Sequence, residues 1–212
     1  MRYIILLFFL LILSCGQGKR YHDKVQTTEV ESPGIADILK FQKELDQSLR
    51  DPETSPLPDR YRKSFKGLDY FEPDTTYVVK ARFELTPDAE PFLLSTTTDR
   101  KSWEVLYGIA HFDLNGAEHQ LEVYQTLDLV GQEEYEDYLF LPFLDETNGD
   151  ETYGGGRYID LSIPEGDTLV IDFNRAYNPY CVYNKKYSCP LVPRQNYLRT
   201  KVRAGVKDFK VE

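Results

Sequence analysis

The feature of this chain that most constrains its fold is a series of short strand-like segments that begins at residue 77. After its first positions, the segment 77–85 alternates apolar and polar side chains, so Val79, Ala81, Phe83 and Leu85 are predicted to lie on one face. Further segments of this kind cover residues 92–98, 103–114, 120–127, 138–144, 157–163 and 168–173. No helical pattern alternates with them. The predicted fold class is therefore mainly β, an antiparallel barrel or sandwich.

The segments are separated by residues that favour turns. Asn115-Gly116 predicts a tight hairpin between 103–114 and 120–127, with residues 117–119 either in the second strand or in a bulge. Pro142 interrupts an apolar run and suggests an edge strand or a strand end.

The last two strand-like segments, 157–163 and 168–173, are predicted to pair with each other. Pro164-Glu165-Gly166-Asp167 would form the turn between them.

One helix is expected before the strands. Ser32-Pro33 is typical of a helix start, and Ile38, Leu45 and Leu49 follow at helical spacing up to about Arg50. Asp51-Pro52 ends the pattern. We expect this helix to pack across one opening or face of the β structure.

The N-terminus has the pattern of an export signal. Met1-Arg2 precedes an apolar run over residues 3–13, and Ser14-Cys15 follows. Residues 11–15 resemble a bacterial lipobox, in which the cysteine is acylated and the chain is cut just before it. We predict a signal peptide over residues 1–14 and lipidation of Cys15. The alternatives are an ordinary signal peptide with a chance cysteine, or an uncleaved anchor.

Lipidation of Cys15 predicts both a membrane partner and a location. The polar residues 15–34 are expected to form a flexible tether between the acyl chains and the domain. Gly16 follows the cysteine where an Asp would favour retention, so the usual sorting rule predicts the outer membrane, facing the periplasm. The protein is thus expected in the cell envelope.

The charge balance excludes one class of partner. The chain carries 25 Lys and Arg against 35 Asp and Glu, a net charge of −10. An acidic surface of this kind argues against nucleic acid, because binding to the phosphate backbone depends on Lys and Arg. Solubility is the simpler explanation of the charge.

Two cysteines remain beyond the lipid-acceptor residue. In an oxidising compartment, Cys181 and Cys189 are predicted to form a disulfide, with two free thiols or half of a metal site as the alternatives. No metal is predicted, because their spacing does not fit a zinc ribbon and the three histidines are scattered. No cofactor is predicted either.

Three polar stretches distinguish residues 143–198 from the rest of the chain. They read FLDETNGDETYGGGRY over 143–158, DFNRAYNPYC over 172–181 and CPLVPRQNYL over 189–198. These stretches resemble the hallmarks of a bacterial family, the domain of unknown function 1684. The resemblance covers about residues 35–205 and identifies residues 35–212 as a single mainly-β domain. Members often end in Ala-Gly-Glu, where this chain has Ala204-Gly205-Val206. The family has no agreed activity, so the resemblance implies none.

The same segment contains the candidate ligand-binding residues. It combines one arginine with carboxylates, amides and a tyrosine beside a glycine run at 154–156, the composition of a polar pocket. The candidates are Arg157, Asp145, Glu151, Asp172, Asn174, Tyr153 and Asn178. We predict that they bind a small polar ligand, such as a sugar or a small acid, or an envelope partner.

Two other functions remain open for these residues. A pair of the carboxylates at the right separation would suit a hydrolase, for example one acting on glycosides. Alternatively, the residues only brace irregular loops by satisfying backbone groups, and the protein is purely structural. No recognised catalytic motif favours an enzyme.

Overall fold

The computed structural model describes residues 33–210 of the 212-residue chain. These residues belong to the second of the two compact units into which the chain divides, Glu31–Glu212. The predicted signal peptide (residues 1–14), the lipid-acceptor Cys15 and residues 16–32 of the predicted tether lie outside the described residues. Within residues 33–210, no helix combines the length and the apolar character that crossing a membrane requires.

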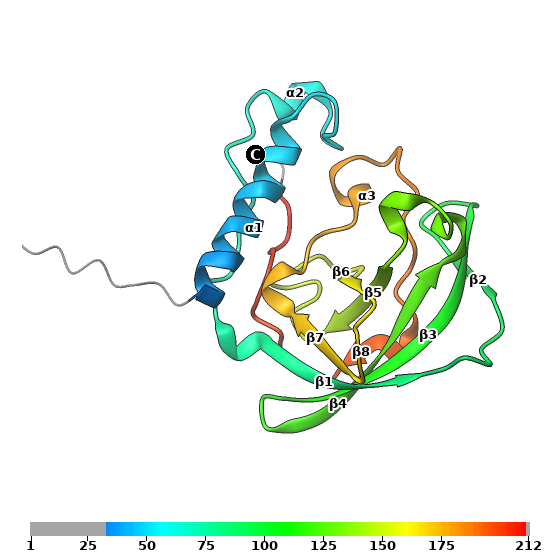
Figure 1. Cartoon of the computed structure of the whole chain (residues 1–212). Coiled ribbons are helices and arrows are strands. Elements are labelled where there is room, and N and C mark those ends of the chain that lie inside the picture. The colour runs from blue at the N-terminus through cyan, green and yellow to red at the C-terminus, as the bar shows by residue number, and fades with distance from the viewer. Residues whose placement is uncertain (1–32, 211–212) are drawn as a thin grey trace, which may run out of the picture. The chain divides into compact units, whose positions relative to one another are not determined.

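The described unit is built on an eight-stranded sheet that curls into a half-barrel (Figure 1). The strand order is β6-β5-β4-β3-β1-β7, with β2 paired to β3, and β8 paired to β5 in parallel. The strands are β1 (Val78–Leu85), β2 (Phe92–Ser95), β3 (Lys101–Leu114), β4 (Ala117–Thr126), β5 (Tyr138–Asp145), β6 (Arg157–Ser162), β7 (Thr168–Asp172) and β8 (Tyr197–Leu198). The predicted mainly-β fold class with one N-terminal helix is confirmed.

Helices precede the first strand and connect several of the later ones. The α-helices are α1 (Pro33–Arg50), α2 (Asp59–Arg62) and α3 (Tyr180–Tyr183), and the 3-10 turns are η1 (Thr75–Tyr77), η2 (Leu127–Leu129), η3 (Glu133–Tyr135), η4 (Phe173–Arg175) and η5 (Arg194–Asn196). Among the described residues, α1 is the only helix longer than four residues.

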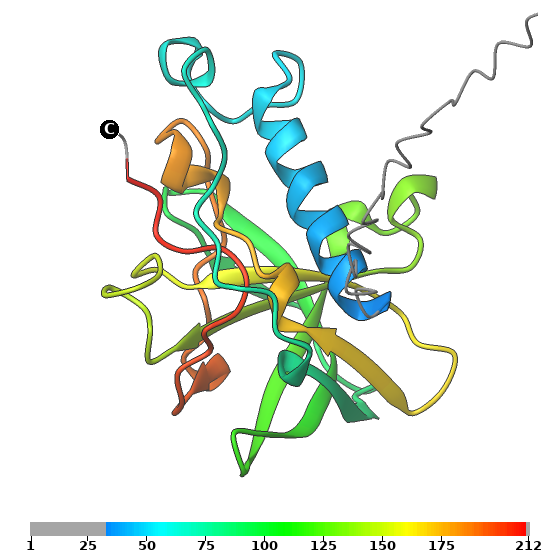
Figure 2. The same ribbon diagram turned by 90° about the vertical axis from the view of Figure 1, so that its left-hand side faces the viewer.

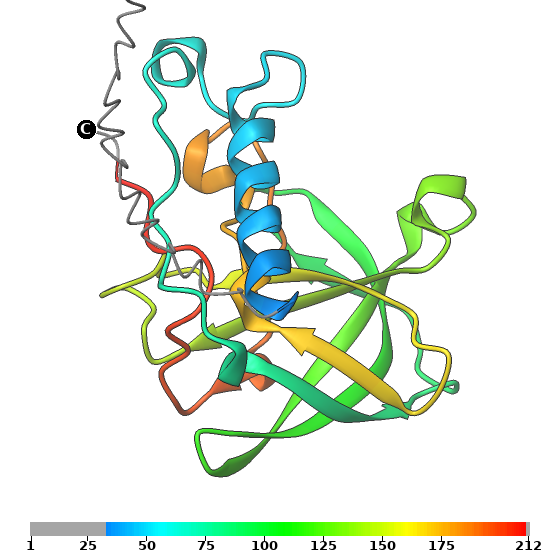
Figure 3. The ribbon, with the colours of Figure 1, turned by 60° about the vertical axis from the view of Figure 1, so that its left-hand side comes forward.

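The connection between the two edge strands requires the sheet to curl. β6 and β7 are consecutive in the sequence and joined by residues 163–167, yet they stand at opposite ends of the strand order. A connection of this length spans roughly 20 Å at full extension, whereas the edge strands of a flat six-stranded sheet would be about 24 Å apart. Figure 2 and Figure 3 show this connection between β6 and β7 as a yellow loop. The predicted pairing of 157–163 with 168–173 is therefore wrong, because the two strands are neighbours in the sequence and not in the sheet.

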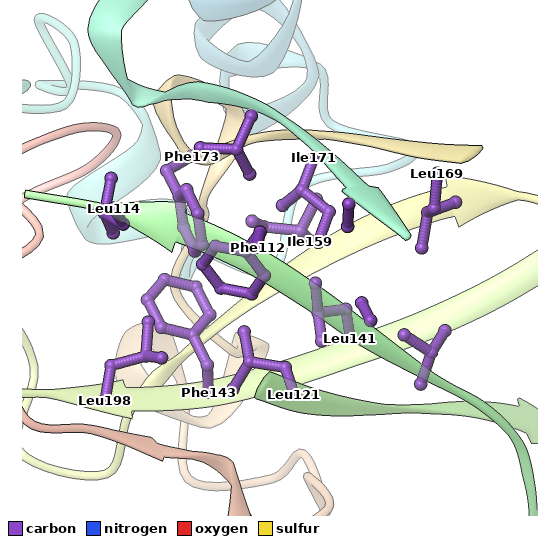
Figure 4. Close-up of a cluster of buried hydrophobic side chains, with 14 of the residues drawn as sticks. Phe112, Leu114, Leu121, Leu141, Phe143, Ile159, Leu169, Ile171, Phe173 and Leu198 are labelled. Carbon is purple, nitrogen blue, oxygen red and sulfur yellow. The ribbon is translucent and has the colours of Figure 1, made fainter. Parts of the chain in front are cut away.

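The hydrophobic core fills the concave side of the half-barrel. Ile159 of β6 and Ile171 of β7 belong to the same buried cluster, so the core reaches both edges of the sheet (Figure 4). The fully buried Phe173 packs against two other rings of this cluster, with centroids 5.8 Å from that of Phe112 and 5.3 Å from that of Phe143. Each fully buried phenylalanine contributes roughly 1.5–3 kcal/mol.

The central hairpin forms at the predicted turn. Asn115 and Gly116 have φ angles of 52° and 78° between the paired residues Leu114 and Ala117. Positive φ at both positions gives the twist that joins two strands tightly. Residues 117–119 belong to β4, and the irregularity in this pair lies instead between Leu106 and Gly108 of β3.

Helix α1 packs on a second, smaller cluster outside the barrel core. Ile38 and Leu49 are buried on one side of the helix, and Leu49 packs with Leu57 and with Tyr183 of α3. The helix begins at Pro33, two residues inside the predicted tether. Figure 3 shows α1 lying outside the sheet and beside α3.

A side chain completes the sheet where β4 and β5 separate. Pro142 lies inside β5, so it does not mark a strand end. It is paired with Tyr158 of β6 but not with β4, whose pairing with β5 is limited to Phe140, so the predicted edge position is met locally. Its carbonyl accepts a hydrogen bond of 2.7 Å from Asn196 Nδ2, which also donates to the Glu122 carbonyl of β4. The Glu122 amide in turn donates to Asn196 Oδ1 at 2.8 Å. The Asn196 amide thus takes the place of a peptide group between the strands, and the missing N–H of proline leaves no donor unsatisfied.

Candidate functional site

The predicted ligand-binding arginine lies inside the core. The Arg157 side chain has no exposed surface and forms an ion pair of 2.9 Å between Nη2 and Asp145 Oδ2. The same guanidinium donates to the carbonyls of Val202, Ala204 and Val206. Both residues occupy core-facing positions at the ends of β6 and β5, because side chains alternate along a strand.

The second oxygen of Asp145 extends the same network. Asp145 Oδ1 accepts from the amides of Thr147, at 2.8 Å, and Val202, at 3.1 Å. Burial lowers the pKa of Arg157, and the attraction of the Asp145 carboxylate opposes that shift. The pair therefore braces the C-terminal segment 202–206 against the sheet. Neither side chain is accessible to a ligand, which corrects their assignment as binding residues.

Asn174 and Asp172 form another bridge between loops. Asn174 is buried, and its side-chain amide exchanges hydrogen bonds of 3.0 Å and 2.8 Å with the backbone of Asp74. Asp172 Oδ1 accepts from both the amide and Nδ2 of Asn174. This arrangement ties η4 to the loop before β1. The two residues satisfy backbone groups, as the alternative of structural bracing expected.

The remaining candidates, Asn178, Glu151 and Tyr153, make separate contacts. Asn178 is buried and donates to the Lys207 carbonyl at 3.0 Å. Glu151 accepts from Arg203 and lies 3.5 Å from Lys201 Nζ. Tyr153 is half-buried beside Cys181. The structure therefore does not bring the predicted set together in one open pocket.

The two cysteines are free thiols in this structure. Cys189 is buried and Cys181 is half-buried, and their sulfur atoms are not at disulfide distance. The Cys181 amide donates to Cys189 Sγ at 3.1 Å. A hydrogen bond from the Cys189 thiol lowers the pKa of Cys181 to about 7, and the same contact raises the pKa of Cys189. The predicted disulfide is corrected to a hydrogen-bonded thiol pair.

A cleft of about 550 Å³ lies on the opposite face of the sheet from the core. Tyr138 of β5 and Asp160 of β6 line its floor, α1 contributes Phe41, and Tyr177 and Tyr187 come from the segment after β7. Its size is that of a small-molecule site, and most such sites are largely apolar with a few polar groups. None of the seven candidate ligand-binding residues selected from the sequence lines this cleft, although Cys189, which was predicted to form a disulfide, does.

A β-bulge in β3 turns the carboxyl group of Glu104 toward the cleft. On the C-terminal side of this bulge, the even-numbered residues Ala110 and Phe112 face the core. Between Leu106 and Gly108 the register shifts by one residue, so the even-numbered Glu104 faces the cleft instead. The strand can therefore carry core residues at one end and polar cleft residues at the other.

Asp160 is held by two tyrosines of the cleft. The hydroxyl groups of Tyr177 and Tyr138 donate to Asp160 Oδ1 at 2.6 Å and 2.9 Å. Desolvation among the surrounding rings raises the pKa of Asp160, although these two hydrogen bonds lower it. Burial also raises the pKa of both tyrosines, so they remain protonated donors.

Glu104 is a buried carboxyl group at the other side of the cleft. Ser102 Oγ donates to Oε1 at 2.7 Å and Thr126 Oγ1 donates to Oε2 at 2.9 Å. Burial raises the pKa of Glu104; nearby Asp128 also raises it, whereas the hydrogen bonds and Arg100 lower it. In the sequence this residue looks like an ordinary exposed position of an alternating strand, so no sequence signal indicates its role.

A second hollow, of about 610 Å³, lies at the β3–β4 end and is lined mainly by polar side chains such as Arg82, His111 and His119. His111 Nε2 is 3.3 Å from Glu84 Oε2. Within residues 33–210, no three histidine, cysteine or acidic side chains are grouped so that they could hold a metal ion. This hollow lacks the aromatic walls of the cleft, so the cleft is the better candidate site.

The fold and the cleft define a mainly-β half-barrel protein with a tyrosine-lined cleft on the outer face of its sheet. The chain belongs to the family described as Protein of unknown function (DUF1684), whose model matches residues 63–207. The family membership inferred from the three polar stretches is therefore confirmed.

A solved structure of an uncharacterised protein from Haloarcula marismortui is similar to this chain. The two share 34% sequence identity with a TM-score of 0.64, and the match covers 81% of this chain and 92% of that chain. No functionally curated protein matches the chain.

Proposed function

We propose that this protein is a lipid-anchored protein of the cell envelope that binds a small polar ligand in the tyrosine-lined cleft. The anchor would be acylated Cys15, in the outer membrane and facing the periplasm, as the lipobox-like residues and Gly16 favour. The cleft replaces the polar segment as the place where the ligand binds.

The observation that carries the proposal is the composition of the cleft. It combines aromatic walls with the solvent-accessible carboxylate of Asp160, whose position is set by two tyrosine hydroxyls. Tyrosine offers a large contact area at a low entropic cost, together with a polar group. A carboxylate at the floor then supplies the directional interaction that a polar ligand needs.

The geometry supports a hydrolase less well. Glu104 and Asp160 both have raised pKa values, which would suit general acids. However, they lie on β3 and β6, three strand spacings apart, which is about 14 Å along the sheet. Paired carboxylates in glycoside hydrolases are about 5–9.5 Å apart. The separation is too large for that mechanism.

Ligand binding is tested by a thermal-shift screen of sugars, amino acids, organic acids and organic amines. A ligand present at a hundred times its Kd stabilises the folded state by about 2.7 kcal/mol, which raises Tm by roughly 5–10 °C for a chain of this size. Tyr177→Phe removes the hydroxyl group that is 2.6 Å from Asp160 and should reduce the shift.

Tyr197→Phe is the matched control, because Tyr197 is an exposed tyrosine of β8 outside the cleft. It should respond to the ligand as the wild type does. The proposal fails if no compound gives a shift that depends on Tyr177.

The anchor is tested separately by feeding cells an alkyne-labelled fatty acid. The full chain should incorporate the label, and Cys15→Ser should abolish incorporation without changing the folded domain. Label that persists in the variant would contradict lipidation at this residue.

A further inference from the structure

The cleft carries more negative than positive charge. Glu104, Asp128 and Asp160 line it, whereas Arg100 is its only lining cation among the described residues. Within residues 33–210, no lysine or arginine lies within ion-pair distance of Asp160. Arg175 attracts Asp160 from beyond ion-pair distance, and its guanidinium lies 4.8 Å from the ring centroid of Phe41, which also lines the cleft. The cleft thus contains a carboxylate that no cation of the described residues contacts directly.

The walls of the cleft consist of aromatic rings in edge-to-face arrangements. The ring centroids of Tyr158 and Tyr177 are 6.0 Å apart with the planes at 90°, and those of Tyr180 and Tyr187 are 5.4 Å apart at 65°. Edge-to-face packing points successive rings in different directions, so both edges and faces border the same space. The negative face of an aromatic ring attracts a cation, most strongly where water is excluded.

Asp160 is in direct contact with two tyrosines of the cleft. Tyr138 and Tyr177 both direct their hydroxyl groups to Oδ1 of the carboxylate. In the described part of the chain, Oδ2 accepts no hydrogen bond from a protein group. One oxygen therefore orients the carboxylate, and the other remains available to a ligand.

We propose that the ligand of this cleft is an organic cation, a substituted ammonium compound whose charged head lies between Asp160 and the tyrosine rings. This inference rests on the proposed ligand-binding function and specifies its ligand class. A metal ion fits less well, because the described residues offer no group of three acidic, histidine or cysteine ligands. A substituted ammonium ion fits because its carbon-bound surface is weakly hydrated and packs against aromatic rings.

The cleft volume is consistent with such a ligand. About 550 Å³ accommodates a small organic molecule with its head group and a polar substituent. Arg100 on the exposed rim would interact favourably with a neutral or anionic end of the ligand and unfavourably with a second cationic end. A monocation is therefore preferred over a polyamine.

The experiment compares choline chloride with 3,3-dimethylbutan-1-ol, which has the same shape but a carbon atom in place of the charged nitrogen. Isothermal titration of the wild-type protein at constant ionic strength should show choline binding at least tenfold more tightly. This comparison needs no variant, so it is independent of any folding defect. Equal binding of the two compounds would overturn the proposal.

Asp160→Asn is the second test, because it removes the charge but keeps an oxygen that accepts from the two tyrosines. Choline affinity should fall at least tenfold. Asp88→Asn makes the same chemical change at an exposed position outside the cleft and should leave the affinity unchanged. Wild-type affinity in Asp160→Asn would overturn the proposal.

Failure of this inference can be told apart from failure of the proposed function. If N-acetylglucosamine or citrate binds, choline does not, and Tyr177→Phe abolishes that binding, the cleft is a ligand site of another class. If none of the three compounds binds in a manner that depends on Tyr177, both the inference and the proposed function are wrong.

Discussion

Replacing Arg157 by methionine tests the conclusion that this residue braces the fold. The substitution keeps a long apolar stem but removes the guanidinium, which pairs with Asp145 and donates to the carbonyls of Val202, Ala204 and Val206. Asp145 is then left as a buried carboxylate without a cation. Breaking a buried ion pair from one side costs about 3–5 kcal/mol.

That loss is large compared with the stability of a domain. The free energy of unfolding of a native protein is about 5–15 kcal/mol. For a chain of this size, each kcal/mol corresponds to about 2–4 °C in Tm, so Arg157→Met should lower Tm by roughly 6–20 °C. The C-terminal segment 202–206 should lose protection first, because three of its carbonyls and the Val202 amide depend on the pair.

Urea unfolding measures the free-energy loss, and hydrogen exchange of residues 202–206 shows where the structure opens. Arg203→Met is the control, because Arg203 forms an exposed ion pair with Glu151 that is worth about 0–1 kcal/mol. Asp145→Asn added to Arg157→Met should recover part of the stability, since it removes the unpaired charge. A loss below about 1 kcal/mol for Arg157→Met would refute this reasoning.

Three further predictions concern a backbone position and two titratable groups. Gly205 has φ +76°, and a Cβ there would lie 2.7 Å and 2.8 Å from two carbonyl oxygens around the η4 turn. An alanine in the left-handed conformation alone costs roughly 1–2 kcal/mol, and Gly205→Ala should lower the free energy of unfolding by more than this amount. Gly116→Ala is the control in the same urea assay, because Gly116 also has a positive φ but open space around it, so it measures the conformational cost alone. Burial raises the pKa of Glu104 in the folded state, so the folded protein holds a proton that the unfolded chain has already lost. The stability of the wild type therefore falls as pH rises from the unfolded-state pKa to the raised folded-state pKa. Glu104→Gln should remove this fall, so the Tm of the variant should exceed that of the wild type by more at pH 8 than at pH 5. The Cys181 thiol, with a pKa of about 7, should be alkylated by iodoacetamide with a midpoint near pH 7, and Cys189→Ala should move that midpoint upward.

Parts of the fold can be predicted from the sequence because they depend on local signals. Asn115-Gly116 has few backbone alternatives to a tight turn, and the helical spacing of Ile38, Leu45 and Leu49 leaves one apolar face to bury. By contrast, the pairing of β6 with β7 was predicted from their adjacency in the sequence. It is wrong because the curled sheet brings its two edges near each other without pairing them.

The candidate site could not be found in this way, for a reason that concerns strand periodicity. Arg157 and Asp160 lie three residues apart on β6 and therefore point to opposite faces. The sequence does not reveal which face is the core, and an arginine next to a glycine run suggested a pocket. The structure places Arg157 in the core and Asp160 in the cleft.

By itself, the sequence determined the β-rich class, the tight hairpin, the family and the expectation of a lipid anchor, because each depends on residues that are close together in the chain. Only the tertiary structure decided that the polar segment braces the C-terminus and that the cleft lies elsewhere. The physical reason is that the cleft is assembled from β3, β5, β6, α1 and the segment 177–190, which are distant in the sequence. The face to which each polar side chain points depends on a bulge and on the curl of the sheet, and neither is encoded in a local pattern.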